Sequence, residues 1–151
     1  MRVCLRIGRK SNDMLPVKEL LALFVAGGLG SLSRFGLSTY FVSVFGKGTP
    51  WGTAIVNLLG CLCFGAVAAL FASRSHWDPR MKTIILTGFL GAFTTFSTYM
   101  FELHAFLKSG EYGTACADFL LQNVGGLFAV LLGRVDASFV ICSCCNQISL
   151  R

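Results

Sequence analysis

Residues 55–70 read IVNLLGCLCFGAVAAL and contain no charged side chain. A helix on the surface of a soluble bundle needs a polar face that recurs about every 3.6 residues, and this stretch has none. It lies inside a longer apolar segment, from about Trp51 to Ala72, which has the roughly 20 residues that a helix needs to cross a bilayer. The stretch therefore predicts a transmembrane helix.

Three further apolar segments accompany this one, and short connectors separate all four. Charged residues make up 13% of the chain and hydrophobic residues 54%, with a mean hydropathy of +0.69, whereas soluble domains carry about 25% charged residues. Connectors this short place consecutive helices antiparallel. We therefore expect an all-α membrane protein of four transmembrane helices rather than a soluble bundle. The other three helices are expected from about Leu20 to Phe45, Thr83 to Leu107 and Tyr112 to Gly133.

Lysine and arginine side chains fall mainly on one side of this arrangement. Ten lie in the two terminal flanks and the connector between the second and third helices, against two in the other connectors. This bias predicts cytoplasmic termini and membrane anchoring rather than nucleic-acid binding. A start at Met14 lowers the bias to six against two, and no cleaved signal peptide is expected. Three regions are predicted: a basic extension at 1–17, a four-helix transmembrane domain at 18–134 and a tail at 135–151.

Cysteine and histidine positions do not predict catalytic chemistry. The chain has seven cysteines, but their spacing is not that of a disulfide framework or a zinc site. The cysteine cluster within residues 142–145 leaves metal binding open as an alternative for the tail. His76 and His104 have no cysteine or acid at ligand or triad spacing, so we do not expect an enzyme.

Polar residues inside the first two helices are candidates for function because such groups are costly in lipid. Arg34 lies past the middle of the first helix, where it could either extend to the far interface or attract anions. Thr53, Asn57 and Gly60 share one face of the second helix by their i, i+4, i+7 spacing. Asn57 could join two helices, but we favour a role in a pore, because its amide NH₂ can donate to an anion without a fixed charge that would trap it.

The third helix has the most informative pattern, TGFLGAFTTFSTYMFE at residues 87–102. Gly88 and Gly91, with the four hydroxyl residues that follow within positions 94–98, favour a break near Gly91–Thr95, and the carbonyl groups freed there would need a partner such as Na⁺. Phe96 and Tyr99 are spaced i, i+3, and aromatic edges can solvate a small anion, although ordinary packing is the more common role of aromatic residues at this spacing. Glu102 follows near the end of the helix, where it could simply face water. In the fourth helix, the polar residues are Asp118, Gln122 and Asn123.

The residues just described resemble the CrcB/Fluc family of fluoride channels over most of the region from Leu20 to Gly133. The resemblance begins with GGLG at 27–30 followed by Arg34. It continues with PWGT at 50–53 and VNLLG at 56–60. Its most specific element is GFLGAFTTFST at 88–98 with Glu102, and the occurrence of all three elements in order makes the match strong.

The resemblance implies an antiparallel, dual-topology dimer with two narrow fluoride pores. Backbone carbonyls of Gly91 and Thr94 would bind a structural Na⁺ at the dimer centre. Asn57 would donate hydrogen bonds in the pore, and Phe96 would belong to an aromatic box around fluoride. The fluoride pore would be formed by Asn57, Phe96, Tyr99, Thr53, Thr98, Glu102 and Arg34.

Three departures from the family pattern are visible. Tyr99 stands where the family usually has phenylalanine, and residues 124–130 lack the hydroxyl groups that relatives often carry there. The third departure is the charge bias, which is strong for a chain that inserts in both orientations. A homologous partner of opposite orientation is therefore an alternative to a homodimer.

The expected function is fluoride-selective, passive export across the bacterial inner membrane, which would relieve fluoride toxicity. The membrane potential drives anions outward with about 2.3 kcal/mol per 100 mV. Two alternatives stay open. One is a proton-coupled small four-helix exporter, and the other is a membrane assembly subunit that does not transport.

Overall fold

The computed structural model describes residues 17–46, 48–73, 78–135 and 137, and every regular element in these ranges is helical. Four helices are long and apolar enough to cross a membrane, with 29, 23, 31 and 24 residues. Even the shortest extends about 35 Å at 1.5 Å per residue, more than the roughly 30 Å of a bilayer core. The four predicted apolar helices are thus confirmed as Val17–Phe45, Trp51–Ser73, Pro79–Ser109 and Tyr112–Val135.

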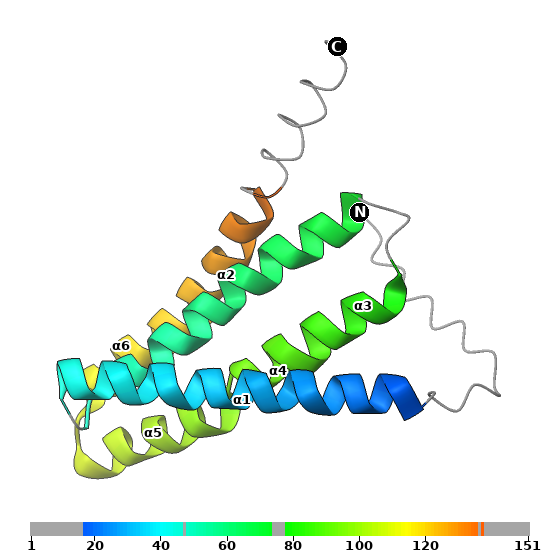
Figure 1. Cartoon of the computed structure of the whole chain (residues 1–151). Coiled ribbons are helices and arrows are strands. Elements are labelled where there is room, and N and C mark those ends of the chain that lie inside the picture. Colours follow the sequence, from blue (N-terminus) through cyan, green and yellow to red (C-terminus); the bar gives the residue numbers. More distant parts are fainter. Residues whose placement is uncertain (1–16, 47, 74–77, 136, 138–151) are drawn as a thin grey trace.

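The first two spans are the continuous helices α1 (Val17–Phe45) and α2 (Trp51–Ser73) (Figure 1). The third and fourth spans are built from several segments. The third comprises α3 (Pro79–Thr83), the π-helical η1 (Ile84–Leu90), α4 (Gly91–Phe93) and α5 (Phe96–Ser109). The fourth comprises α6 (Tyr112–Leu120) and the π-helical η2 (Leu121–Gly125), followed by a helix that ends at Val135.

Local sequence signals fix several of the helix ends. Asp78 caps α3 by accepting a hydrogen bond from the backbone N–H of Arg80, and Pro79 occupies the first turn, where its missing N–H has no cost. At the other end of this span, Gly110 has a φ of 81° and donates its N–H back to the carbonyls of the last turn of α5. Such a left-handed residue ends a helix most easily as glycine.

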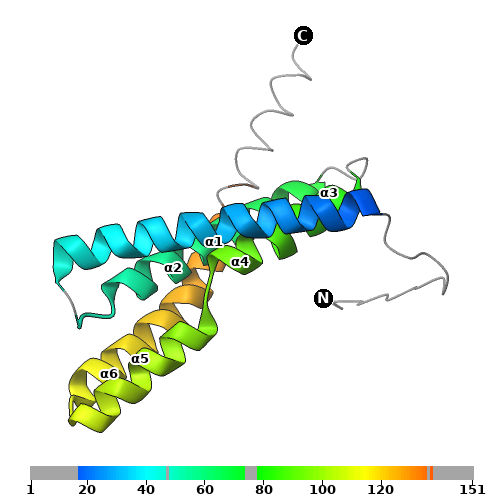
Figure 2. The same cartoon turned by 60° about the horizontal axis from the view of Figure 1, so that its bottom comes forward.

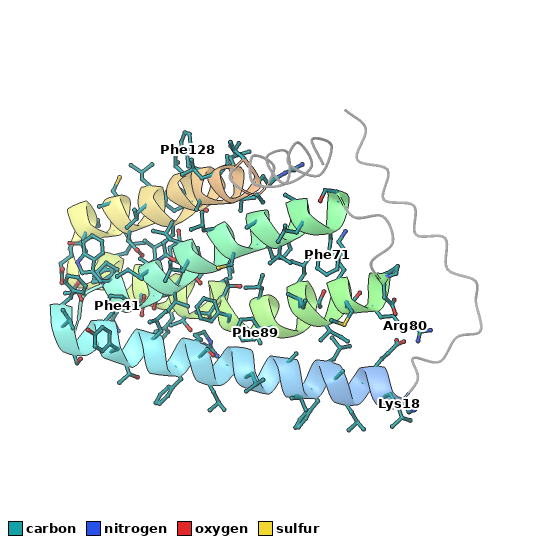
Figure 3. The ribbon with its side chains drawn as sticks, turned by 45° about the horizontal axis from the view of Figure 1, so that its top comes forward. Lys18, Phe41, Phe71, Arg80, Phe89 and Phe128 are labelled. Carbon is teal, nitrogen blue, oxygen red and sulfur yellow. The ribbon has the colours of Figure 1, made fainter. Side chains whose placement is uncertain are left out.

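Helix α1 lies across η1 and α4 and also contacts α2. Helices α5 and α6 are in contact, and Figure 2 shows them side by side and diverging from α1. An ion pair of 2.7 Å between Glu19 and Arg80 joins the start of α1 to α3, at the end of the bundle where Lys18 and Arg80 are labelled in Figure 3.

Glycines allow two of the helices to touch at their backbones. A Cβ at Gly65 of α2 would collide with the carbonyl oxygen of Val130 in the fourth span, and a Cβ at Gly133 would collide with the carbonyl oxygen of Leu62. Small residues permit this close approach between membrane helices, which then associate through van der Waals contact.

The outer surface is apolar. Phe24, Phe35 and Phe101 have exposed fractions of 80%, 72% and 74%, and Phe128 points away from the other helices in Figure 3. A soluble protein rarely exposes so much apolar surface, whereas lipid or a neighbouring subunit would cover it. Residues 1–16, 136 and 138–151 lie outside the described residues. These ranges hold nearly all of the predicted extension and tail, including the tail cysteines, and His76 also lies outside the description.

Candidate functional site

Helical geometry stops in the middle of the third span. Helix α4 ends at Phe93, Thr94 and Thr95 have extended backbone with ψ angles of 157° and 113°, and α5 begins at Phe96. Thr95 caps α5, since its Oγ1 accepts a hydrogen bond from the N–H of Thr98 at 3.3 Å and lies 2.9 Å from the Thr98 hydroxyl. Non-helical backbone inside a membrane requires such partners for its polar groups.

Asn57 of α2 provides the partners for the backbone of Thr95. The N–H of Thr95 donates to Asn57 Oδ1 at 2.8 Å, and Asn57 Nδ2 donates to the Thr95 carbonyl at 3.0 Å. One side-chain amide therefore replaces both hydrogen bonds that a helix would have given this residue. Gly60 lies one turn further along α2, where a Cβ would collide with the methyl group of Thr94.

The same contacts change the surroundings of two carbonyl groups. In an uninterrupted helix, the carbonyl of Gly91 would accept from the N–H of Thr95, but that N–H donates to Asn57. The carbonyl of Thr94 would accept from the N–H of Thr98, which donates to the Thr95 hydroxyl instead. Both carbonyls have thus lost their helical donors, and Gly91 itself is exposed.

A chain of hydrogen bonds continues from Asn57 to the fourth span. Asn57 Nδ2 donates to Gln122 Oε1 at 2.7 Å, and Gln122 Nε2 donates to Asp118 Oδ1 at 2.8 Å. The side chain of Asp118 is 1% exposed, and its other oxygen, Oδ2, has no hydrogen-bond partner among the described residues. A buried carboxylate oxygen without a partner is costly and is therefore a candidate for function.

Thr53 and Glu102 form a second polar contact one turn along α2. The Thr53 hydroxyl donates to Glu102 Oε1 at 2.7 Å and is almost completely buried. Glu102 Oε2 is buried and has no hydrogen-bond partner among the described residues. Glu102 therefore faces the protein rather than water.

The two aromatic residues at the start of α5 differ in exposure. Their rings pack edge to face with centroids 5.8 Å apart. Tyr99 is 3% exposed and its hydroxyl accepts a hydrogen bond of 2.7 Å from Asn123, whereas Phe96 is 69% exposed. Phe96 is thus available to a neighbouring molecule on one side.

These groups surround a cavity of about 260 Å³ between α2, the break and the fourth span. Its lining combines neutral polar groups with aromatic rings, and includes Asn57, Thr94, Thr95, Phe96, Tyr99, Gln122 and Asn123. A second cavity of about 500 Å³ lies at the end of the bundle formed by the first and third connectors. Asp118 lines this second cavity, so the chain Asn57–Gln122–Asp118 extends from one cavity to the other.

Most of the site residues predicted from sequence come together here. Asn57, Phe96 and Tyr99 line the first cavity, and Thr98 contacts the lining residue Thr95. Thr53 and Glu102 form their own contact, one turn along α2 from Asn57. Arg34 lies apart from these contacts on α1, with a buried Nε that has no hydrogen-bond partner among the described residues. Sequence reasoning did not place Gln122 and Asp118 in the site, although their i, i+4 spacing in an apolar helix was a signal.

Known proteins similar to this chain share nearly the whole transmembrane region. The family described as "CrcB-like protein, Camphor Resistance (CrcB)" matches residues 21–134. A protein of Nitrosococcus oceani named fluoride-specific ion channel FluC is 43% identical over 116 residues, which cover 77% of this chain and 93% of that protein. Proteins of the same name from Maridesulfovibrio salexigens and Hydrogenovibrio crunogenus are 42% and 39% identical, over 83% and 78% of this chain and 98% and 89% of their own lengths.

Proposed function

We propose that this chain, which belongs to the CrcB family, is a multi-pass channel of a bacterial membrane that conducts fluoride selectively and passively. The relatives named fluoride-specific ion channel FluC support fluoride as the ion that is conducted. The observation that carries the mechanism is the cavity of about 260 Å³, which is lined by neutral amides, hydroxyls and aromatic rings between membrane-spanning helices. This lining suits the transfer of an ion rather than catalysis.

The chemistry of the lining fits a small, strongly hydrated anion. Such an ion leaves water only where donors replace its hydration shell. Amide N–H groups, hydroxyls and the positive edges of aromatic rings can do so without a permanent charge that would hold the ion. Asn57 supplies the amide, and Phe96 and Tyr99 supply the ring edges.

A structural Na⁺ is the second part of the proposal. The carbonyls of Gly91 and Thr94 have lost their helical donors to Asn57 and Thr95, and hard oxygen ligands of this kind suit a small cation. Bound there, Na⁺ would supply the positive charge that satisfies carbonyls at the centre of a broken helix. The extended backbone at Thr94 and Thr95 supports the break.

The third part is an antiparallel dimer that encloses the pores. Phe96 lines the cavity and is 69% exposed, and Gly91 at the start of α4 is also exposed, so a single subunit leaves the pathway open at its side. A second subunit inserted in the opposite orientation would close it. The partner is a second copy of this chain or a homologous protein of opposite orientation.

Efflux from liposomes tests this function directly. Purified protein is reconstituted, and fluoride and chloride release are recorded with electrodes while a K⁺ ionophore balances the charge. Rapid fluoride release with little chloride release is expected. Folded protein that releases no fluoride, alone or with a co-expressed homologue of opposite orientation, would contradict the proposal and leave an assembly subunit that does not transport.

A proton-coupled exporter is the second candidate, because Asp118 and Glu102 are carboxylates buried within the membrane spans. Coupling requires an ionisable group at depth. The two candidates differ in one measurement: a pH gradient imposed without a fluoride gradient drives fluoride uptake through an exporter faster than the leak of HF into protein-free liposomes, whereas a channel adds no uptake to that leak. We expect no pH-driven uptake beyond the leak.

A further inference from the structure

Asn57 has no free N–H in this structure. Its Nδ2 carries two hydrogens, and it donates to the Thr95 carbonyl at 3.0 Å and to Gln122 Oε1 at 2.7 Å. Its Oδ1 accepts from the N–H of Thr95 at 2.8 Å. An anion that is to bind Asn57 must therefore displace an acceptor, and the Gln122 carbonyl is the one that belongs to a movable side chain.

The orientation of the Gln122 amide is set by Asp118. A carboxyl oxygen that carries no proton only accepts hydrogen bonds, and Asp118 Oδ1 accepts from Gln122 Nε2 at 2.8 Å. The end of the amide that faces Asp118 is therefore the NH₂ group, and the carbonyl end is left facing Asn57.

We infer that Asp118 is a positioning residue that directs the Gln122 carbonyl at Asn57, where it competes with fluoride for an amide N–H. The inference rests on the proposed channel function and adds a determinant of fluoride affinity to it. Two amide NH₂ groups facing each other would bind an anion tightly between them. A carbonyl on one side weakens that binding, which keeps the ion mobile.

The burial of Asp118 is consistent with this role. Its side chain is 1% exposed, and Oδ2 has no hydrogen-bond partner among the described residues. A carboxylate kept for packing alone would be destabilising at such a position. Asp118 lines the second cavity together with Thr114 and Glu111 and contacts Gln122 on its other side, so its carboxyl group lies between that cavity and Gln122.

Two substitutions of Gln122 test whether its carbonyl competes with fluoride for Asn57 or only supports the structure. Gln122→Met removes the competing carbonyl and frees one N–H of Asn57, so the fluoride concentration that gives half-maximal current should fall about three- to tenfold, the range expected for one hydrogen bond. Gln122→Glu puts a second carboxyl group against Asp118, with which it shares one proton, and presents to Asn57 a partly charged oxygen that can only accept, so the same concentration should rise. The measurement is current through reconstituted channels in planar bilayers as a function of fluoride concentration, with Leu120→Met, an exposed position on α6, as the control.

A third variant tests the action of Asp118 through Gln122. Asparagine at this position can donate as well as accept, so Asp118→Asn allows the Gln122 amide to invert. The fluoride concentration that gives half-maximal current should then fall, as it does for Gln122→Met. In the double variant, Asp118→Asn should add nothing to Gln122→Met, because its only route of action is gone.

The inference is supported if the fluoride concentration at half-maximal current falls in Gln122→Met and rises in Gln122→Glu, and if Asp118→Asn adds no further shift to Gln122→Met. Shifts in the same direction, unchanged currents, or an additive effect of Asp118→Asn would overturn it. If Asp118→Asn does not fold, the Gln122 pair decides alone. Wild-type protein without fluoride current would instead contradict the proposed function, so the two failures are distinguishable.

Discussion

The side-chain amide of Asn57 pairs with both backbone groups of Thr95, at 2.8 Å for the N–H and 3.0 Å for the carbonyl, across 38 positions of sequence. This pairing joins the second span to the non-helical part of the third. It gives Asn57 a structural task beside the proposed role in the pore, and the two roles can be separated by mutation.

Asn57→Asp should abolish fluoride current while the protein still folds. Aspartate keeps an oxygen to accept from the N–H of Thr95, but it has no N–H to donate and adds a negative charge to the pathway. Asn57→Leu should also abolish current, and it should lower stability because both Thr95 groups lose their partner, at about 1–3 kcal/mol each. Liposome efflux and thermal unfolding in detergent measure the two effects. Wild-type fluoride efflux in either variant would remove Asn57 from the pore.

Tyr99→Phe should retain fluoride efflux within about threefold. The ring edge stays in place, and Asn123 keeps its other hydrogen bond, to the carbonyl of Phe119 at 2.8 Å. Loss of the 2.7 Å bond from Asn123 to the Tyr99 hydroxyl should cost about 1 kcal/mol of stability. A folded variant without efflux would show that the hydroxyl itself acts on the ion, a result that the ring-edge argument does not allow.

Gly60→Ala should destabilise the protein by about 1–3 kcal/mol, because the added methyl group meets the Thr94 methyl and lies 3.3 Å from the ring of Phe93. The matched control is Gly113→Ala in α6, where a Cβ has no neighbour within 4 Å. That change should be neutral or stabilising, since alanine favours a helix by up to about 1 kcal/mol over glycine. Thermal unfolding of both variants gives the comparison, and equal melting temperatures would contradict the close contact.

Replacing Na⁺ by a bulky organic cation should lower both the melting temperature and fluoride efflux, if Gly91 and Thr94 bind the ion through carbonyl oxygens. Thr94→Ser is the matched variant. It keeps the backbone and the hydroxyl that donates to the Leu90 carbonyl at 3.1 Å, and should therefore retain the wild-type response to Na⁺. Stability and efflux that are the same in both salts would argue against the cation site.

Hydropathy located the membrane spans well because it depends on local composition alone. The second and fourth spans were predicted to begin at Trp51 and Tyr112, and they do. The third span starts at Pro79 rather than near Thr83, since the cap at Asp78 extends the helix into a more polar stretch. Local signals of this kind are readable in a sequence once the helix is known.

The partners within the site were harder to predict, because they connect distant parts of the chain. Periodicity put Thr53 and Asn57 on one face of a helix but could not say what that face meets. Gln122 was seen only as a polar residue in the fourth helix, and its contact with Asn57 spans 65 positions. The direction of the Arg34 side chain could not be predicted from the neighbouring sequence either, and the structure places this residue away from the cavity.

The reciprocal glycine contacts between α2 and the fourth span limit how this molecule can move. Gly65 meets the backbone at Val130, and Gly133 meets the backbone at Leu62, so no flexible side chain lies between the two helices at these points. Sliding one helix past the other would force peptide groups into each other. We therefore expect the ion path on this side to change its width by rotation of side chains such as Gln122, on the timescale of rotamer changes rather than of helix displacement.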